Sequence, residues 1–332
     1  MDSLHDVPSF GAFQFDAGYF SRPQVHAILT IPDGRKVCDI LISRMNMQLA
    51  TVRSDTLPAG STRAAVNSAD GWVVLDAPDL SALLSDTPGM KTWQEAVESA
   101  LASSSQKVAS EDLEFLNPLP NPRKVICCGL NYRDHILETG RELPKFPTLF
   151  AKFAETLTDP NAEITVIGSE KVDWEAELAI VAGAKLQRAG KEEAAKGILG
   201  YTIANDVSMR DWQHRTLQWL QGKAFDRTTP VGPVVVTADE LDPKSGLEVT
   251  CSINGNQTQS GNTRELVFDA AALLSYVSQF TTLHPGDLIL SGTPGGIGGA
   301  MNPPVFLNDG DEVVTAIEGI GELRNVFRIQ SD

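Results

Sequence analysis

Two glutamates lie two positions apart in KVDWEAELAIV, an otherwise apolar stretch that spans residues 171–181. Alternate side chains of a β-strand share a face, so Asp173, Glu175 and Glu177 would project together from one face. Burying carboxylates is costly unless a cation or a hydrogen-bond donor satisfies them. The stretch therefore indicates either a cation site or the solvated outer face of an edge strand.

A third acid favours the cation site. Asp206 follows an apolar run in YTIANDVS, where a strand could end at a cavity. Glu175, Glu177 and Asp206, with no Cys or His at ligand spacing, form an all-oxygen ligand set. Such a set prefers Mg²⁺ or Mn²⁺, with Ca²⁺ as a further candidate, and disfavours zinc.

A histidine and a glutamate lie three positions apart in LNYRDHILETG. If the segment is helical, His135 and Glu138 share one face. A carboxylate beside an imidazole can orient it and raise its basicity, as a general base that activates water requires. The alternative is an ordinary His/Glu pair on the surface.

Cationic and amide side chains follow in MRDWQHRTLQWLQGKAFD. Arg210 and Gln213 could grip a substrate carboxylate, and Lys223 could neutralise an oxyanion. Such cations are usually solvated on the surface, although the apolar residues after Lys223 suggest partial burial.

A Gly-rich loop follows an apolar strand in SGTPGGIG, residues 291–298. It lacks the ending of a P-loop and the spacing of a dinucleotide fingerprint. Its glycines and the Thr293 hydroxyl could still approach an anion closely. A tight turn is the alternative, and it requires only the glycines.

Composition limits the partners and the location. The chain has 332 residues and a net charge of −16, so nucleic acid and anionic membrane surfaces would repel it. No window approaches the roughly 20 consecutive apolar residues of a membrane span, and the acidic N-terminus does not look like a secretory signal. We expect a soluble, cytoplasmic protein, with Cys38, Cys127, Cys128 and Cys251 as free thiols.

The elements that must position these residues are mainly strands. Beyond Lys124, short apolar runs bounded by turn residues predict strands, and one longer helix is predicted over 262–280 with Asn262 as its cap. Few helices and no βαβ alternation favour an α+β fold or a mixed β-roll. We predict a leader at 1–46, a small α+β module at 47–118 with two short helices, and a catalytic domain at 119–332.

Taken in order, these segments resemble the fumarylacetoacetate hydrolase family over roughly residues 120–330. The matching motifs are GLNYRDH with Glu138, DWEAELAIV, GYTIANDVSMRD, QWLQGKAFD with PVGP, LHPGDLILSGTPGGIG, and GDEVVTAIEGIGELRN. The resemblance implies a mixed β-sandwich roll, usually in a homodimer, behind a small N-terminal α+β module.

The resemblance also implies roles for individual residues. It places a Mg²⁺ or Mn²⁺ ion on Glu175, Glu177 and Asp206, and water activation on His135 and Glu138. Lys223 acts on the substrate, and the remaining contacts to the substrate fall on Arg210, Gln213, Thr293 and Lys152. Phe153 stands where many relatives have proline, which changes the expected shape of the pocket mouth.

The reaction that we predict is hydrolysis of a carbon–carbon bond in a 1,3-diketo acid of the acylpyruvate or fumarylpyruvate type. His135, held by Glu138, would activate water, and the metal with Lys223 would stabilise the enolate that cleavage leaves. The same enolate arises when oxaloacetate loses CO₂ or when a 2-hydroxy-dienedioate is isomerised. A decarboxylase or an isomerase is therefore the alternative.

Overall fold

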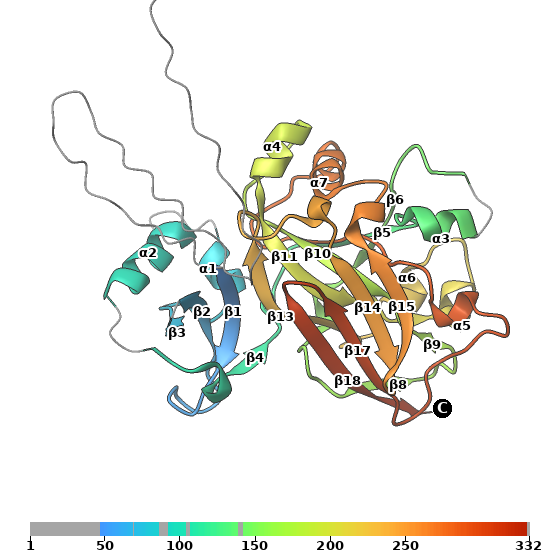
Figure 1. Cartoon of the computed structure of the whole chain (residues 1–332), viewed down its shortest axis with the longest axis horizontal. Coiled ribbons are helices and arrows are strands. Elements are labelled where there is room, and N and C mark those ends of the chain that lie inside the picture. Colours follow the sequence, from blue (N-terminus) through green and yellow to red (C-terminus); the bar gives the residue numbers. More distant parts are fainter. Residues whose placement is uncertain (1–46, 69, 86–91, 104–106, 139–141, 331–332) are drawn as a thin grey trace, which may run out of the picture. The chain divides into compact units, whose positions relative to one another are not determined.

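The computed structural model describes residues 47–68, 70–85, 92–103, 107–138 and 142–330 (Figure 1). These residues belong to one compact unit, Arg44–Asp332. The predicted leader and Cys38 lie outside the described residues, and nothing is described of the His135 and Glu138 side chains. Among the described residues, no helix is long and apolar enough to cross a membrane.

Strands make up most of the regular secondary structure. Their bounds are β1 (Gln48–Arg53), β2 (Arg63–Ser68), β3 (Gly71–Val74), β4 (Glu114–Leu116), β5 (Val125–Gly129), β6 (Thr148–Lys152), β7 (Leu157–Thr158), β8 (Ile164–Ile167), β9 (Val172–Asp173), β10 (Ala176–Ala182), β11 (Ile198–Asn205), β12 (Ser208–Met209), β13 (Thr229–Thr237), β14 (Glu248–Ile253), β15 (Asn256–Asn262), β16 (Leu288–Leu290), β17 (Glu312–Ile317) and β18 (Gly321–Gln330).

The helices are short. They are α1 (Leu80–Leu84), α2 (Trp93–Ser103), α3 (Arg133–Glu138), α4 (Lys191–Lys196), α5 (Arg210–Gln213), α6 (Leu220–Lys223) and α7 (Ala270–Ser278). Two of them, α1 and α2, are the pair predicted for the small module. The α+β fold class predicted from the sequence is confirmed.

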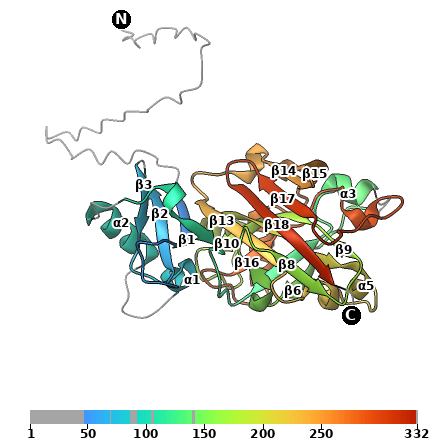
Figure 2. The same cartoon turned by 90° about the horizontal axis from the view of Figure 1, so that it is seen from below.

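Two sheets form the layers around the core. Within the described residues, one sheet has the order β3-β2-β1-β13-β11-β10-β16-β5-β6, with β4 and β7 paired to its side, and the other has the order β15-β14-β17-β18-β8. Most pairs are antiparallel, but β16 pairs with β5, β18 with β8 and β7 with β13 in parallel. In both views β14 and β17 of the second sheet lie to one side of β10 (Figures 1 and 2).

The strand β1 joins the small module to the larger sheet, because it pairs antiparallel with β13. The division into a domain at 47–118 and a second at 119–332 stays a prediction.

Strand β10 lies between two apolar cores. Leu178 and Ile180 pack in the core shared with the five-stranded sheet, while Ala179 and Val181 pack in a second core on the opposite face. A strand buried on both faces needs a nearly continuous apolar run, which the sequence ELAIVA supplies. The packing therefore fixes β10 from both sides.

Two local predictions were wrong. The stretch at 171–181 is not one strand, since it breaks at Trp174 and Glu175, and all of Val172–Ala182 is buried. The helix predicted over 262–280 begins only at Ala270, with Asp269 as its cap, while Asn262 caps a separate 3₁₀ turn. Phe268 N donates to Asn131 Oδ1 at 2.8 Å, so tertiary contacts hold the segment between them extended.

The cap of α7 gives a test of the fold. Asp269 Oδ1 accepts from Ala272 N at 2.8 Å, and Lys191 Nζ lies 2.9 Å from Asp269 Oδ2. We expect Asp269→Ala to lower the free energy of unfolding by about 1 kcal/mol at pH 7, as for other N-caps. Asp269→Asn should lose less, because its side-chain oxygen can still cap the helix. Urea unfolding of both variants measures this, and equal losses would contradict the capping role.

The same carboxylate predicts a pH dependence. Burial raises the pKa of Asp269, but the Lys191 ion pair and the Ala272 N–H outweigh it and hold the pKa below its ordinary value. The stabilisation is therefore present above the unfolded pKa of about 3.9 and is lost as the pH falls through the folded pKa. The difference in the free energy of unfolding between wild type and Asp269→Asn should therefore become smaller as the pH falls over that acid range.

Candidate functional site

Three predicted carboxylates meet in the structure. One carboxylate oxygen from each of Glu175, Glu177 and Asp206 lies within 4.8 Å of the others, and all three residues are buried. The antiparallel pairing of β10 with β11 explains the cluster, because it sets Ala176 opposite Asn205 and so brings the end of β11 to the start of β10. Asp206 N donates to Glu175 O at 2.9 Å, which closes the corner.

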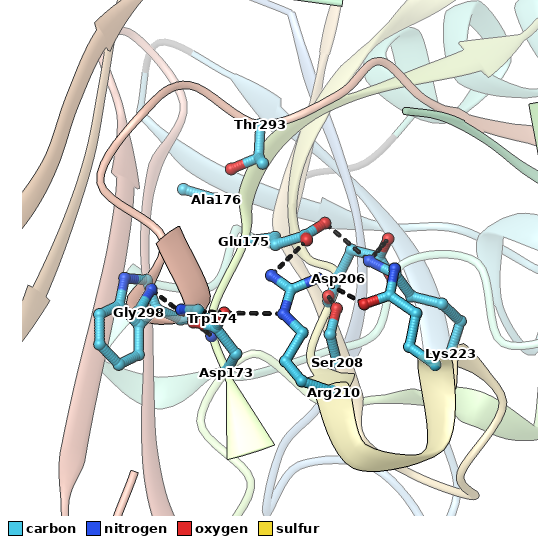
Figure 3. Close-up of polar contacts among 12 residues, drawn as sticks. Asp173, Trp174, Glu175, Ala176, Asp206, Ser208, Arg210, Lys223, Thr293 and Gly298 are labelled. Atoms are coloured by element: carbon cyan, nitrogen blue, oxygen red, sulfur yellow. Dashed lines mark hydrogen bonds and ion pairs between the residues drawn. The ribbon is translucent and has the colours of Figure 1, made fainter. Parts of the chain in front are cut away.

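Two buried lysines reach this cluster, and Figure 3 shows one of them, Lys223, beside Glu175 and Asp206. Lys223 Nζ donates to Glu175 Oε2 at 2.7 Å and to Asp206 Oδ2 at 2.8 Å. Lys152 Nζ donates to Asp206 Oδ1 at 2.7 Å. The contacts place both predicted lysines beside the carboxylates, and Lys223 is more deeply buried than the sequence indicated.

The electrostatics keep these pairs ionised. Burial lowers the pKa of Lys223, but Asp206 and Glu175 outweigh it and hold the pKa above its ordinary value. Burial likewise raises the pKa of Asp206, and Lys152 and Lys223 outweigh it in the opposite direction. Lys223 is therefore a fixed cation, suited to stabilise negative charge and not to accept a proton.

Glu177 has a different environment. Its Oε2 accepts from Gly292 N at 2.8 Å, but within the described residues no Lys, Arg or His forms an ion pair with it. Burial, followed by the charges of Asp206 and Glu175, raises its pKa well above the ordinary value. A cation is what this carboxylate lacks.

The residues therefore fit a divalent ion. A buried set of three carboxylates is the oxygen-only donor set that Mg²⁺ and Mn²⁺ prefer. Glu175 and Asp206 have cationic partners in the protein, but Glu177 has none among the described residues. The ionised form of Glu177 is therefore the one that a bound ion would stabilise most. Which metal binds stays a prediction.

Asp173 does not belong to this cluster, although the sequence placed it on the same face. It is fully buried, and its carboxylate accepts from Gly298 N, Gly299 N and Arg210 Nε, each at 2.8 Å. Added Cβ atoms would crowd this contact: one at Gly298 would collide with Val305 O, and one at Gly299 would lie 3.1 Å from Asp173 Oδ2. Asp173 thus ties the Gly-rich loop to Arg210.

Arg210 is held by protein groups on three sides. Besides Asp173, Nη1 donates to Gln213 Oε1 at 2.8 Å, and Nη2 lies 2.7 Å from Glu175 Oε1. Since a guanidinium only donates, the oxygen of the Gln213 amide must face it, and the amide nitrogen faces away. Gln213 lines a cavity beside the carboxylate cluster, so its NH₂ group can donate to a ligand there. Substrate binding by Arg210 itself stays a prediction.

A cavity of about 610 Å³ opens beside the cluster. Glu175, Glu177 and Lys223 lie in its wall, and Phe150 and Trp219 add apolar surface. Thr293 also lines it, on the loop that passes above Glu175 and Ala176 in Figure 3. Gly292, with φ +103°, brings this loop close to Glu177, and a Cβ there would lie 2.9 Å from Cys128 O.

The remaining predictions have mixed outcomes. Helix α3 carries His135 and Glu138 as expected, but their side chains are not among the described parts of the structure. The water-activating pair therefore stays a prediction. Cys127, Cys128 and Cys251 are buried free thiols.

Sequence reasoning missed three residues of the site. Asn205 Oδ1 accepts from Glu175 N at 2.9 Å, Gln259 contacts the Gly-rich loop, and Asp173 ties that loop to Arg210. Asp173 shares the spacing of the two glutamates, so a signal for it existed. For Gln259, in a polar hairpin strand, the sequence offers none.

Comparison with known sequences agrees with these features. The family profile described as Fumarylacetoacetate (FAA) hydrolase C-terminal matches residues 124–328. A Xenopus laevis protein named oxaloacetate tautomerase fahd2, mitochondrial, is 39% identical over 289 residues, which cover 85% of this chain and 90% of that protein. The human oxaloacetate tautomerase FAHD2A, mitochondrial, is 44% identical over 229 residues, which cover 68% of this chain and 73% of that protein.

Solved structures share the fold. A fumarylacetoacetate hydrolase from psychrophilic Exiguobacterium antarcticum matches with a TM-score of 0.72 at 32% identity, over 85% of this chain and 99% of that one. A 2-hydroxyhepta-2,4-diene-1,7-dioate isomerase from Mycobacterium marinum matches with a TM-score of 0.66 at 31% identity, over 85% of this chain and 98% of that one.

The unpaired charge of Glu177 predicts the behaviour of two variants. Glu177→Gln should weaken Mn²⁺ binding by more than the roughly 10- to 100-fold typical of outer-sphere changes, because it removes a ligand. Asp287→Asn changes another fully buried carboxylate, which accepts from Lys124 N and His284 N outside the cluster, so it is the matched control and should retain Mn²⁺ affinity. Isothermal titration with Mn²⁺ measures both, and equal losses would contradict the ligand assignment.

The raised pKa of Glu177 predicts proton release on metal binding. The metal-free protein is stabilised by the protonated carboxyl below the unfolded pKa, and loses that stability as the pH rises through the folded pKa. Mn²⁺ requires the ionised form, so its affinity should rise with pH over the same range. Titrations in buffers of different ionisation enthalpy count the released protons. A pH-independent affinity would contradict the assignment.

Proposed function

The chain belongs to the fumarylacetoacetate hydrolase family, and from this premise we propose that it interconverts the enol and keto forms of a 2-oxo dicarboxylic acid such as oxaloacetate. Two relatives, at 39% and 44% identity, carry the name oxaloacetate tautomerase. A structural neighbour at 31% identity is named a 2-hydroxyhepta-2,4-diene-1,7-dioate isomerase, so its name too is that of an isomerase.

One observation carries the proposal. The cavity wall combines the unpaired carboxylate of Glu177 with the ammonium group of Lys223. The NH₂ group of Gln213 and the hydroxyl of Thr293 line the same cavity. Such a wall suits an anion whose adjacent oxygens can share a divalent ion with the three carboxylates. A 2-oxo acid has that pair of oxygens in its carboxylate and its oxo group.

A bound Mg²⁺ or Mn²⁺ would supply positive charge that polarises the 2-oxo group. Lys223 has three N–H groups, and two of them donate to Glu175 and Asp206. The third is free to donate to the substrate oxygen that becomes negative when a proton leaves C3. A protonated Lys223 would stabilise that charge as it develops.

The proton at C3 needs a base that is not part of this wall. We assign it to His135, oriented by Glu138, because α3 begins directly after Asn131 and Tyr132, which are buried beside the Gly-rich loop. In tautomerisation the imidazole would take the proton from the enol oxygen or from C3 and return it to the other position. No water is consumed.

Hydrolysis of an acylpyruvate is the second candidate. A structural neighbour at 32% identity is named fumarylacetoacetate hydrolase, and the same base could activate water. Fold and cation site alone do not choose between the two reactions. A homodimer and a cytoplasmic location stay predictions, and the two tautomerase relatives are themselves named mitochondrial.

An assay with freshly dissolved enol-oxaloacetate and Mg²⁺ or Mn²⁺ tests the proposal. We expect the enol absorbance to decay faster with the protein than without it, and C3 hydrogen to exchange with D₂O by NMR. Glu177→Gln should lose this acceleration, since a cluster without its third carboxylate binds the ion poorly. An enol decay equal to the uncatalysed rate would exclude the tautomerase.

The same samples separate the alternatives. Release of CO₂ from oxaloacetate would indicate a decarboxylase. With an acylpyruvate in H₂¹⁸O, label in the released acid would indicate the hydrolase.

A further inference from the structure

A fully buried glutamine contacts both the carboxylate cluster strand and the Gly-rich loop. Gln259 lies in β15, with none of its surface exposed. Its side chain contacts Ala176, the residue between Glu175 and Glu177, and it also contacts Thr293 and Pro294. Gln259 thus joins the five-stranded sheet to two parts of the cavity wall.

The partners of Gln259 determine which way its amide faces. Ala176 N can only donate, and it donates to Gln259 Oε1 at 3.0 Å. The amide nitrogen must therefore face the loop, where it donates to Pro294 O at 3.0 Å and to Thr293 Oγ1 at 2.8 Å. An amide nitrogen has two hydrogens and accepts no hydrogen bond, so both of its hydrogens are used.

This arrangement leaves the Thr293 hydroxyl hydrogen available to donate to another group. Its oxygen accepts from Gln259, so its single hydrogen must point to another acceptor. Thr293 is 8% exposed and lines the cavity that Glu175, Glu177 and Lys223 share. We propose that Gln259 is a positioning residue that makes the Thr293 hydroxyl a hydrogen-bond donor to an anionic oxygen of the bound 2-oxo acid.

The inference rests on the proposed function for the identity of the ligand. A donor whose direction is set before the ligand arrives needs no reorganisation when negative charge develops nearby. The alternative role for Gln259 is a strut that only joins the two sheets. A strut would stabilise the fold but would have no specific dependence on the Thr293 hydroxyl.

A double-mutant cycle separates the two roles. Gln259→Met, Thr293→Val and the double variant are titrated with oxalate in the presence of Mn²⁺, since oxalate carries two adjacent oxygens and is not turned over. Each single change should weaken oxalate binding by about tenfold or more, as expected for a lost hydrogen bond to a charged group. The double variant should bind no more weakly than Thr293→Val, because both changes remove the same donor. Losses that multiply would overturn the proposal.

Two controls remove the structural explanation. Mn²⁺ affinity should be unchanged in Gln259→Met, and a loss would place its role in the carboxylate cluster instead. Asn325→Leu removes another fully buried amide, which donates to Pro160 O at 3.2 Å and to Ala162 O at 2.9 Å. This variant should lower the melting temperature and leave oxalate binding intact.

A second substitution covers the case in which Gln259→Met does not fold. Gln259→Glu keeps an acceptor for Ala176 N, and its ionised carboxylate would take the Thr293 hydrogen. Oxalate affinity relative to wild type should therefore fall as the pH rises, and this fall should vanish in the Thr293→Val background. If Gln259→Glu bound oxalate with wild-type affinity at every pH, the proposal would be overturned. Oxalate binding without conversion of enol-oxaloacetate would instead count against the proposed function alone.

Discussion

The unpaired carboxylate of Glu177 is the constraint on which the rest of the site depends. Asp173, Glu175, Glu177 and Asp206 are buried together with Lys152, Arg210 and Lys223, and among the described residues no cation forms an ion pair with Glu177. Apolar residues of similar volume are often at least as stabilising as buried ion pairs. Such a group in the core does not by itself stabilise the fold, and binding a cation is the function that its carboxylate supports.

The two apolar cores around β10 explain how the protein tolerates this charge. Residues on both faces of the strand are packed, so the backbone that carries Glu177 is held from both sides. The break in the strand after Asp173 lets the acids before and after it contact different groups. Glu175 and Glu177 meet Asp206, while Asp173 turns to Arg210 and to the backbone N–H groups of the Gly-rich loop.

The sequence predicted the fold class and the carboxylate cluster because both leave local signals. Alternation in KVDWEAELAIV placed Glu175 and Glu177 together, as the structure does, while Trp174, Ala176 and Leu178 between and beside them lie in one core. It could not show the strand break, which depends on Asn205 accepting from Glu175 N and on loop contacts more than one hundred residues away. The extended segment before α7 was missed for the same reason, since Asn131 holds it through Phe268.

The hydrogen-bond polarity of the cavity follows from groups that cannot reverse their direction. The Arg210 guanidinium and the Ala176 N–H only donate, and they fix the amides of Gln213 and Gln259 with their oxygens turned away from the ligand space. Gln213, Lys223 and, through Gln259, Thr293 are then left with donors to offer. A wall of fixed donors around a cation site favours an anionic ligand. It discriminates against a ligand that lacks the matching oxygens, because the buried donors would remain unpaired.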